Sequence, residues 1–154
     1  MRIAIAGGTG MVGRRITEAA RERGHDTAVL SRREGVDVLT GKGLDAALEG
    51  SDVVIDALNI GTQNARKATE FFSATSRNLL EAEQRAGVGH HVLLSIVGLE
   101  AADAAYYAGK LAQERRVEAS ALPHTIARAA QFHDGRLSDE RCARSTDVHG
   151  VGAR

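Results

Sequence analysis

A glycine-rich loop near the N-terminus constrains this chain more than any other feature. The residues from Gly7 to Gly13 read GGTGMVG and stand between an apolar run, residues 2–6, and a segment with helical spacing. The glycines fit both G-x-G-x-x-G and G-x-x-G-x-x-G. Glycine permits a sharp strand-to-helix turn and a close approach of the backbone to a pyrophosphate, which the helix N-terminus attracts. The loop therefore predicts a dinucleotide-binding strand–helix–strand unit, although a tight turn without a ligand needs the same residues.

Strand-like and helix-like segments alternate along the rest of the chain. Further strands are predicted at residues 27–30, 36–39, 52–58, 91–97 and 124–127. Helices are predicted from Val12 to near Gly24, and over residues 44–48, 63–86 and 106–121, with Gly87 as the C-cap of the third. This alternation predicts an α/β fold of the Rossmann type: a doubly wound parallel sheet in a three-layer αβα arrangement.

Length and composition indicate one domain. The chain has 154 residues, within the usual range of about 100–200 residues per domain, and its 43% of hydrophobic residues supply a core. We expect the dinucleotide-binding domain to span residues 1–133. Residues 134–154 follow neither a helical nor a strand period, so we expect an irregular C-terminal tail. The single cysteine, Cys142, lies in that tail and excludes a disulfide framework.

The charge balance excludes several classes of partner. Basic and acidic residues both number 20, so the chain has no basic footprint for nucleic acid. No apolar run approaches the ~20 residues of a membrane span, and the N-terminus lacks a signal-peptide pattern. The histidines show no metal-ligand spacing, since the adjacent His90 and His91 would point to opposite faces of a strand. We therefore expect a cytoplasmic protein without a metal.

The residues after the second predicted strand bear on the choice of cofactor. An acidic residue here would bind the ribose hydroxyls of NAD, but the chain has Ser31, Arg32 and Arg33. A hydroxyl and guanidinium groups suit the 2′-phosphate of NADP, so we expect NADP, with Glu34 keeping NAD as the alternative. The two arginines would otherwise be plain surface charges. Asn59 follows the fourth predicted strand at the same edge of the sheet and would either bond the ribose or turn the chain.

A tyrosine, a lysine and a serine predict acid–base chemistry. Tyr106 and Lys110 are four residues apart and share one helix face, and Ser95 lies in the preceding predicted strand. We expect the ammonium to lower the pKa of the phenol, so that Tyr106 exchanges a proton with a substrate oxygen oriented by Ser95. Tyr107 is an alternative to Tyr106. In the simpler interpretation one tyrosine packs under the helix and Lys110 only holds the cofactor.

These segments together resemble the atypical short-chain dehydrogenase/reductase superfamily, in particular its NmrA-like, NAD(P)H-binding branch. The matching stretches are AGGTGMVG at 6–13, LSRR at 30–33, VVIDALN at 53–59, LLSIVGL at 93–99, YYAGKLAQE at 106–114 and HTIARAAQFHD at 124–134. The resemblance implies a cofactor site made of Gly7, Thr9, Gly10, Met11, Val12, Ser31, Arg32, Arg33, Leu58, Asn59 and Lys110. In that site the glycine loop lines the pyrophosphate, Lys110 bonds the nicotinamide ribose, and residues 128–132 lie beside the nicotinamide.

The resemblance also implies the function classes to be weighed. Its members include reductases of small carbonyl compounds and quinones, and non-catalytic redox sensors that bind NADP and regulate a partner. The helix predicted at 63–86 would support a homodimer, or simply cover the sheet. Such proteins continue well past residue 134 with elements that close the substrate pocket. Truncation, a frameshifted end or loss of the substrate portion would each explain the difference, so an inactive remnant is the third interpretation.

Overall fold

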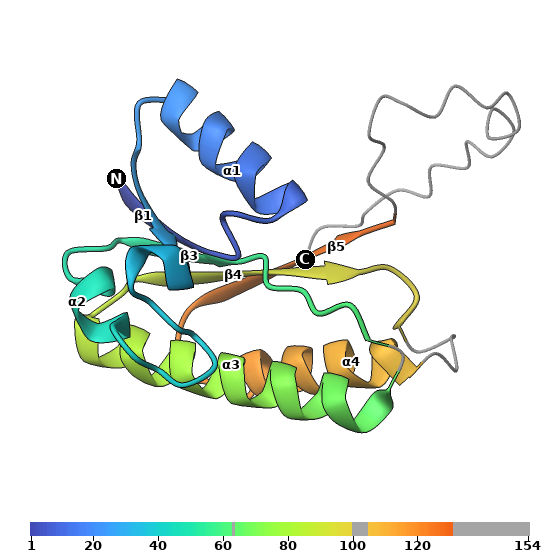
Figure 1. Ribbon diagram of the computed structural model, residues 1–154. Coiled ribbons are helices and arrows are strands. Elements are labelled where there is room, and N and C mark those ends of the chain that lie inside the picture. Colours follow the sequence, from blue (N-terminus) through green and yellow to red (C-terminus); the bar gives the residue numbers. More distant parts are fainter. Residues whose placement is uncertain (63, 100–104, 131–154) are drawn as a thin grey trace, which may run out of the picture.

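The computed structural model describes residues 1–62, 64–99 and 105–130. These residues form a parallel sheet with the strand order β2-β1-β3-β4-β5 (Figure 1). The strands are β1 (Arg2–Ala6), β2 (Asp26–Leu30), β3 (Val53–Asp56), β4 (His90–Ile96) and β5 (His124–Ala129). In the centre of the sheet, Ile5 pairs with Val29 on one side and with Ile55 on the other. The strand order switches direction between β1 and β3, and parallel sheets bind ligands at the carboxyl ends of strands at such a point.

Helices cover both faces of the sheet. They are α1 (Met11–Glu22), α2 (Leu44–Leu48), α3 (Ala65–Ala86) and α4 (Ala105–Glu118), with a short 3₁₀ turn η1 (Arg32–Glu34) after β2. Helix α1 lies on one face, while α3 and α4 lie side by side on the other (Figure 1). The predicted three-layer, doubly wound α/β fold is therefore confirmed. None of the helices within the described ranges is long and apolar enough to cross a membrane.

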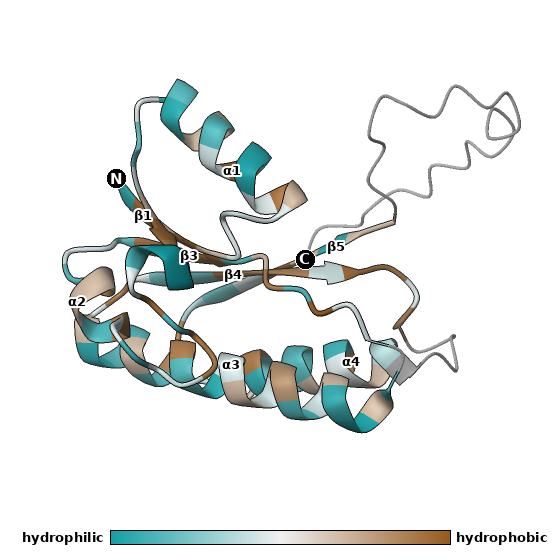
Figure 2. Cartoon of the chain, in the orientation of Figure 1, coloured by the Kyte–Doolittle hydropathy of each residue, from teal (hydrophilic) through white to brown (hydrophobic). Residues whose placement is uncertain are grey.

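The core divides into a layer on each face of the sheet. Alternate residues of β1 supply both layers: Ile3 and Ile5 pack toward Ala20 of α1, while Ala4 and Ala6 join the cluster that contains Leu79 of α3. Side chains of a β-strand alternate between its faces, so a strand buried on both faces reads as a continuous apolar run. Figure 2 shows hydrophobic residues concentrated on β1 and β3, and hydrophilic residues predominating along α1.

One predicted strand is wrong. Residues 36–39 form no strand, and Asp37 makes only an isolated antiparallel bridge with Lys42. The Asp37 carboxylate accepts a hydrogen bond from the Leu39 N–H at 2.9 Å, and Gly41 and Gly43 have positive φ, so the chain turns back at once. Val36 and Val38 of this run are still buried, in the cluster that includes Leu44 and Leu48, whereas Leu39 is exposed. A short apolar run fits a buried turn as well as a strand.

The ends of several elements also differ from the prediction; for example, α4 ends at Glu118 rather than at residue 121. Strand β3 ends at Asp56 rather than residue 58, because the Asp56 carboxylate accepts a hydrogen bond from the Leu58 N–H at 3.0 Å and turns the backbone. Helix α3 begins after Asn64, whose side chain accepts a hydrogen bond from the Lys67 N–H. Its predicted C-cap is confirmed: Gly87 has φ 70° and donates to the carbonyls of the last turn.

Candidate functional site

The glycine loop is built on close backbone approaches. Gly7 has φ +76°, and a Cβ atom there would lie 2.7 Å from the Ala57 carbonyl oxygen beyond β3. A Cβ atom at Gly13 would collide with the carbonyl of Gly7. Only glycine fits both positions, because the loop, the first turn of α1 and the end of β3 meet there without side chains between them.

The N-terminus of α1 faces this loop without a side-chain cap. Gly10 is the N-cap residue with extended backbone, and its carbonyl accepts the first helical hydrogen bond, from the Arg14 N–H at 3.0 Å. No described side chain caps the helix, which leaves N–H groups of the first turn for another acceptor. Together with the positive end of the helix dipole, these groups favour an anion. The loop and helix therefore fit the pyrophosphate of a dinucleotide, as the sequence predicts for Gly7, Thr9, Gly10, Met11 and Val12.

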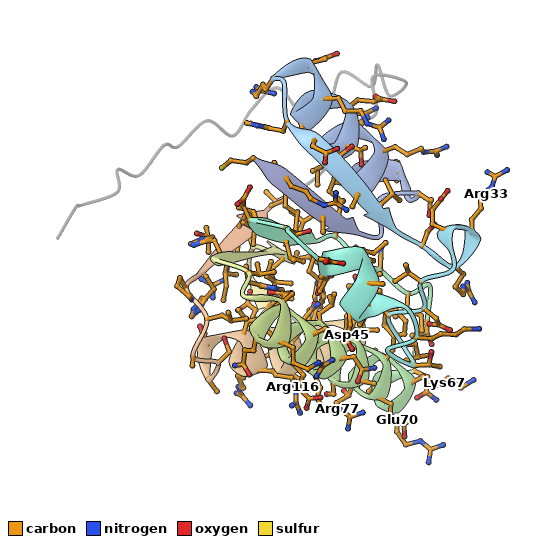
Figure 3. All side chains as sticks on the ribbon, turned by 90° about the vertical axis from the view of Figure 1, so that its left-hand side faces the viewer. Arg33, Asp45, Lys67, Glu70, Arg77 and Arg116 are labelled. Atoms are coloured by element: carbon orange, nitrogen blue, oxygen red, sulfur yellow. The ribbon has the colours of Figure 1, made fainter. Side chains whose placement is uncertain are left out.

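The end of β2 presents the three residues expected at the adenosine phosphate. The Ser31 hydroxyl oxygen is buried and lacks a hydrogen-bond partner among the described residues. Arg32 and Arg33 are exposed in η1, and Figure 3 shows Arg33 extending away from the sheet. An unpartnered buried hydroxyl beside exposed guanidinium groups suits a phosphate or a ribose hydroxyl.

Asn59 lies beyond the end of β3 and contacts α4. The Tyr106 hydroxyl donates a hydrogen bond to the Asn59 Oδ1 atom at 2.7 Å. The turn at the strand end is instead made by Asp56, which binds the Leu58 N–H. Of the two roles considered for Asn59, turning the chain is therefore performed by Asp56, and bonding the ribose stays a prediction.

Tyr106 is more weakly acidic than its lysine neighbour led us to expect. Burial raises the pKa of the Tyr106 phenol, and the nearby Tyr107 adds to the effect. The Tyr106 ring packs edge-on against Phe72, with 5.6 Å between ring centroids. The expectation that Lys110 lowers this pKa is wrong, because the lysine ammonium is engaged elsewhere.

The Lys110 ammonium is buried among acceptors between the sheet and α4. Its Nζ atom donates to the Leu94 carbonyl at 2.9 Å and to the Gln113 Oε1 atom at 2.7 Å, and lies 4.7 Å from the centre of the Phe72 ring. Lys110 is only 3% exposed. Burial lowers the pKa of Lys110, while the negative charges of Asp56 and Glu114 oppose that shift.

Ser95 points into the same buried layer. It is 1% exposed, and its hydroxyl has no hydrogen-bond partner among the described residues, although it lies close enough to Glu114 to help lower the pKa of that carboxyl group. The main cause of the lowered pKa of Glu114 is Arg128, which binds the carboxylate through two nitrogens at 3.0 and 2.8 Å. The structure thus groups Ser95 with Glu114 and does not bond it to Tyr106.

Two residues of this layer were missed by the sequence prediction. Gln113 donates to the Asp56 carboxylate at 2.8 Å, which connects α4 to β3. A sequence signal existed for Gln113, since it lies three residues after Lys110 on the same helix face. Asp56 interrupts an otherwise apolar strand, and that interruption was the only sign of its role.

Other predicted features have a simpler outcome. His90 and His91 do contact different elements: His90 lies 2.9 Å from the Thr125 hydroxyl of β5, and His91 contacts Glu83 of α3. Cys142, the tail predicted for 134–154, and residues 131 and 132 of the 128–132 segment lie outside the described residues.

A parallel sheet with a glycine loop at its switch point defines a dinucleotide-binding protein of the Rossmann type. The family model for NAD(P)H-binding proteins matches residues 7–152, so this chain belongs to that family, and the NAD(P)H-binding family that the resemblance predicted is confirmed. Nicotinamide-dinucleotide binding is the function that the family and the glycine loop share.

This chain spans about half the length of the relatives that it matches. Photosystem II assembly factor Ycf39 of Synechocystis sp. is 28% identical over 152 residues, which cover 89% of this chain and 47% of that protein. A short-chain dehydrogenase/reductase superfamily protein from Agrobacterium tumefaciens with bound NAD has a TM-score of 0.70 at 20% identity, over 83% of this chain and 48% of that one. Triphenylmethane reductase of Citrobacter sp. complexed with NADP(H) has a TM-score of 0.69 at 18% identity, over 88% and 51%. The fold thus serves both cofactors.

Proposed function

We propose that this chain binds NADP(H) and acts as an oxidoreductase on a small carbonyl compound or quinone. The observation that carries the proposal is the pairing of two features at one edge of the sheet. An uncapped helix N-terminus behind Gly7–Gly13 fits a pyrophosphate. At the end of the neighbouring strand β2, a buried unpartnered Ser31 hydroxyl and two exposed arginines suit a 2′-phosphate.

In this proposal, Lys110 and the end of β3 hold the nicotinamide half of the cofactor. Leu58 and Asn59 follow β3 at the carboxyl edge, beside the close approach of Gly7 to Ala57. Two of the three N–H groups of the Lys110 ammonium have acceptors in the protein, which leaves one for a ribose hydroxyl. When bound, NADPH supplies the hydride, and the protein's side chains bind, orient and protonate.

Tyr106 fits the role of proton donor in a reduction. Because burial raises its pKa, the phenol keeps its proton at neutral pH, so it can donate to a developing alkoxide. In the structure the Asn59 side chain accepts the hydrogen bond from this hydroxyl, and a substrate oxygen would have to take its place. Ser95, which is buried beside Glu114, is the proposed orienting group for that oxygen.

A non-catalytic NADP(H) sensor is the second candidate. It is favoured by the internal engagement of the groups a catalyst would need: Tyr106 bonds Asn59, and Lys110 bonds Leu94 and Gln113. The curated relative named an assembly factor is also consistent with a role in binding rather than turnover. An inactive remnant is the third, and it would bind neither nucleotide.

Titration of the purified chain with NADPH and NADH tests these alternatives. Nicotinamide fluorescence reports binding, and a raised melting temperature confirms binding to the folded state. We expect tighter binding of NADPH, weakened in Arg32→Ala and unchanged in Arg77→Ala, an exposed arginine on α3 (Figure 3). NADPH oxidation with a panel of carbonyl compounds and quinones then separates an enzyme from a sensor. A folded chain that binds neither nucleotide would overturn both leading proposals.

A further inference from the structure

A buried side-chain network joins Lys110 to the end of β3 through Gln113. The Gln113 Oε1 atom accepts from the Lys110 ammonium at 2.7 Å, and its Nε2 atom donates to Asp56 Oδ2 at 2.8 Å. Asp56 and Gln113 are both 0% exposed. The other oxygen of Asp56 accepts from the Leu58 N–H at 3.0 Å. The network therefore links α4 to the backbone beside the predicted cofactor residues Leu58 and Asn59.

The orientation of the Gln113 amide follows from the chemistry of its neighbours. The Asp56 carboxylate only accepts hydrogen bonds when ionised, and the Lys110 ammonium only donates them. Gln113 must therefore turn its NH₂ group toward Asp56 and its oxygen toward Lys110, which is the arrangement observed. A bridging amide with one permitted orientation fixes the position of the ammonium more tightly than the flexible lysine side chain would on its own.

We propose that Gln113 is a positioning residue for the dinucleotide site: oriented by Asp56, it holds the Lys110 ammonium so that its remaining N–H is available to a hydroxyl of the cofactor ribose. This inference rests on the proposed function, because it assigns Lys110 to the ribose. Gln113 itself touches neither cofactor nor substrate and acts through Lys110.

The first test uses the chain without any nucleotide. Gln113→Met keeps the length of the side chain but removes both hydrogen bonds. An ammonium that loses an acceptor in a buried site becomes easier to deprotonate. We therefore expect Lys110 to titrate at lower pH in Gln113→Met than in the wild-type chain, and NMR of the lysine side chains measures this titration. Gln113→Glu places a carboxyl group against the ammonium and is expected to move the titration the opposite way. If Gln113 only filled space in the core, the two substitutions would not shift the Lys110 titration in opposite directions.

The second test measures NADPH affinity in a double-mutant cycle. We expect Gln113→Met to weaken NADPH binding about tenfold, the scale of one lost hydrogen bond to a charged group, and to have little further effect in a Lys110→Met background. Gln84→Met, which changes an exposed glutamine of α3, is the matched control and should leave affinity unchanged. If Gln113→Met fails to fold, Gln113→Glu in the same cycle provides the comparison.

The outcomes separate this inference from the proposed function. A wild-type chain that binds no dinucleotide overturns the proposed function and the ribose role of Lys110 together. NADPH binding that Gln113→Met leaves intact, or weakens equally with and without Lys110, overturns the positioning role alone. Identical Lys110 titrations in the wild-type, Gln113→Met and Gln113→Glu chains would do the same.

Discussion

The Tyr106 hydroxyl donates a hydrogen bond to the Asn59 Oδ1 atom, 2.7 Å away, and so joins α4 to the loop after β3. The two residues are 47 positions apart in the sequence and were assigned to different halves of the predicted site. Their contact means that the candidate proton donor and a residue expected beside the cofactor form one unit. A substrate oxygen that accepts the tyrosine proton must replace Asn59.

Substitution of Tyr106 tests the proposed chemistry. Tyr106→Phe removes the hydroxyl and keeps the ring that packs against Phe72. We expect the rate of NADPH oxidation to fall at least about 100-fold, the usual contribution of a positioned acid, with NADPH affinity little changed. Steady-state kinetics and nucleotide titration measure the two effects. Tyr107→Phe is the control, and a larger loss of turnover in that variant would assign the donor to Tyr107.

The glycine loop allows binding and folding to be separated. A Cβ atom at Gly10 would meet only the Gly7 carbonyl oxygen at 3.2 Å, whereas one at Gly13 would collide with the same group. We expect Gly10→Ala to keep its melting temperature within a few degrees but to lose about tenfold or more in NADPH affinity, because its methyl group occupies the space of the pyrophosphate. Gly13→Ala should lower the melting temperature as well. Equal NADPH affinity in Gly10→Ala and wild type would argue against the loop as the phosphate site.

The sequence predicted those parts of the molecule that depend on local patterns. The run from Arg2 to Ala6, the loop that follows it and the glycine cap at Gly87 are each specified by neighbouring residues, and each was predicted. Residues 36–39 were misassigned because a turn buries Val36 and Val38 as well as a strand would, and no neighbouring residue distinguishes the two structures. Short apolar runs carry this ambiguity in general.

The contacts of the candidate site required the tertiary structure. Tyr106 and Lys110 share a helix face, as their spacing predicts, but their partners Asn59 and Leu94 come from the loop after β3 and from β4. Gln113 and Asp56 are 57 residues apart, and their pairing depends on how α4 crosses the sheet. The direction of the Tyr106 pKa was mispredicted for the same reason: burial and the engagement of Lys110 are properties of the packing, not of the spacing.

Helix α4 approaches α3 closely because Gly109 lacks a side chain. A Cβ atom at this position would lie 2.8 Å from the Ala68 carbonyl carbon, a backbone atom that cannot rotate away. Overpacking costs about 1–3 kcal/mol, whereas alanine gains about 1 kcal/mol over glycine in a helix interior. We therefore expect Gly109→Ala to lose about 1 kcal/mol of unfolding free energy, measured by urea denaturation. Gly61→Ala, whose added atom meets no described residue within 4 Å beyond its chain neighbours, should change it by less than about 0.5 kcal/mol.

A buried ion pair predicts how stability depends on pH. His91 Nδ1 lies 2.9 and 3.0 Å from the two carboxylate oxygens of Glu83. Burial raises the pKa of Glu83. Burial opposes the charged form of His91, but the hydrogen bond and charge of Glu83, with the charge of Asp56, outweigh it and raise the pKa of His91. Both directions mean that the folded chain binds more protons than the unfolded chain, so the unfolding free energy falls as pH rises.

The pH range of this effect follows from the pKa of His91 in the unfolded and folded chains. The contribution of His91 is fully present below its unfolded pKa of 6.5 and is lost as pH rises through its raised value in the folded chain. Urea denaturation between pH 6 and 9 should therefore show declining stability, and Glu83→Gln should flatten the decline, because it removes the charge that favours imidazolium. His90→Gln, which changes the partly exposed neighbour bonded to Thr125, should retain the slope. A slope retained in Glu83→Gln would contradict the assignment.

The end of β2 predicts the selectivity of the site for NADP over NAD. Ser31→Asp places a carboxylate where a buried, unpartnered hydroxyl now lies. The new charge repels a 2′-phosphate and accepts hydrogen bonds from ribose hydroxyls, the arrangement that NAD-binding sites use. We expect the ratio of NADPH to NADH affinity to fall at least about tenfold, since charge-assisted contacts to a phosphate are among the stronger hydrogen bonds. Parallel fluorescence titrations measure the ratio, with Arg77→Ala as the control for a charge change remote from the site. If Ser31→Asp weakens both nucleotides equally, Ser31 lies outside the selectivity-determining contact, and the exposed Arg32 and Arg33 alone would have to supply it.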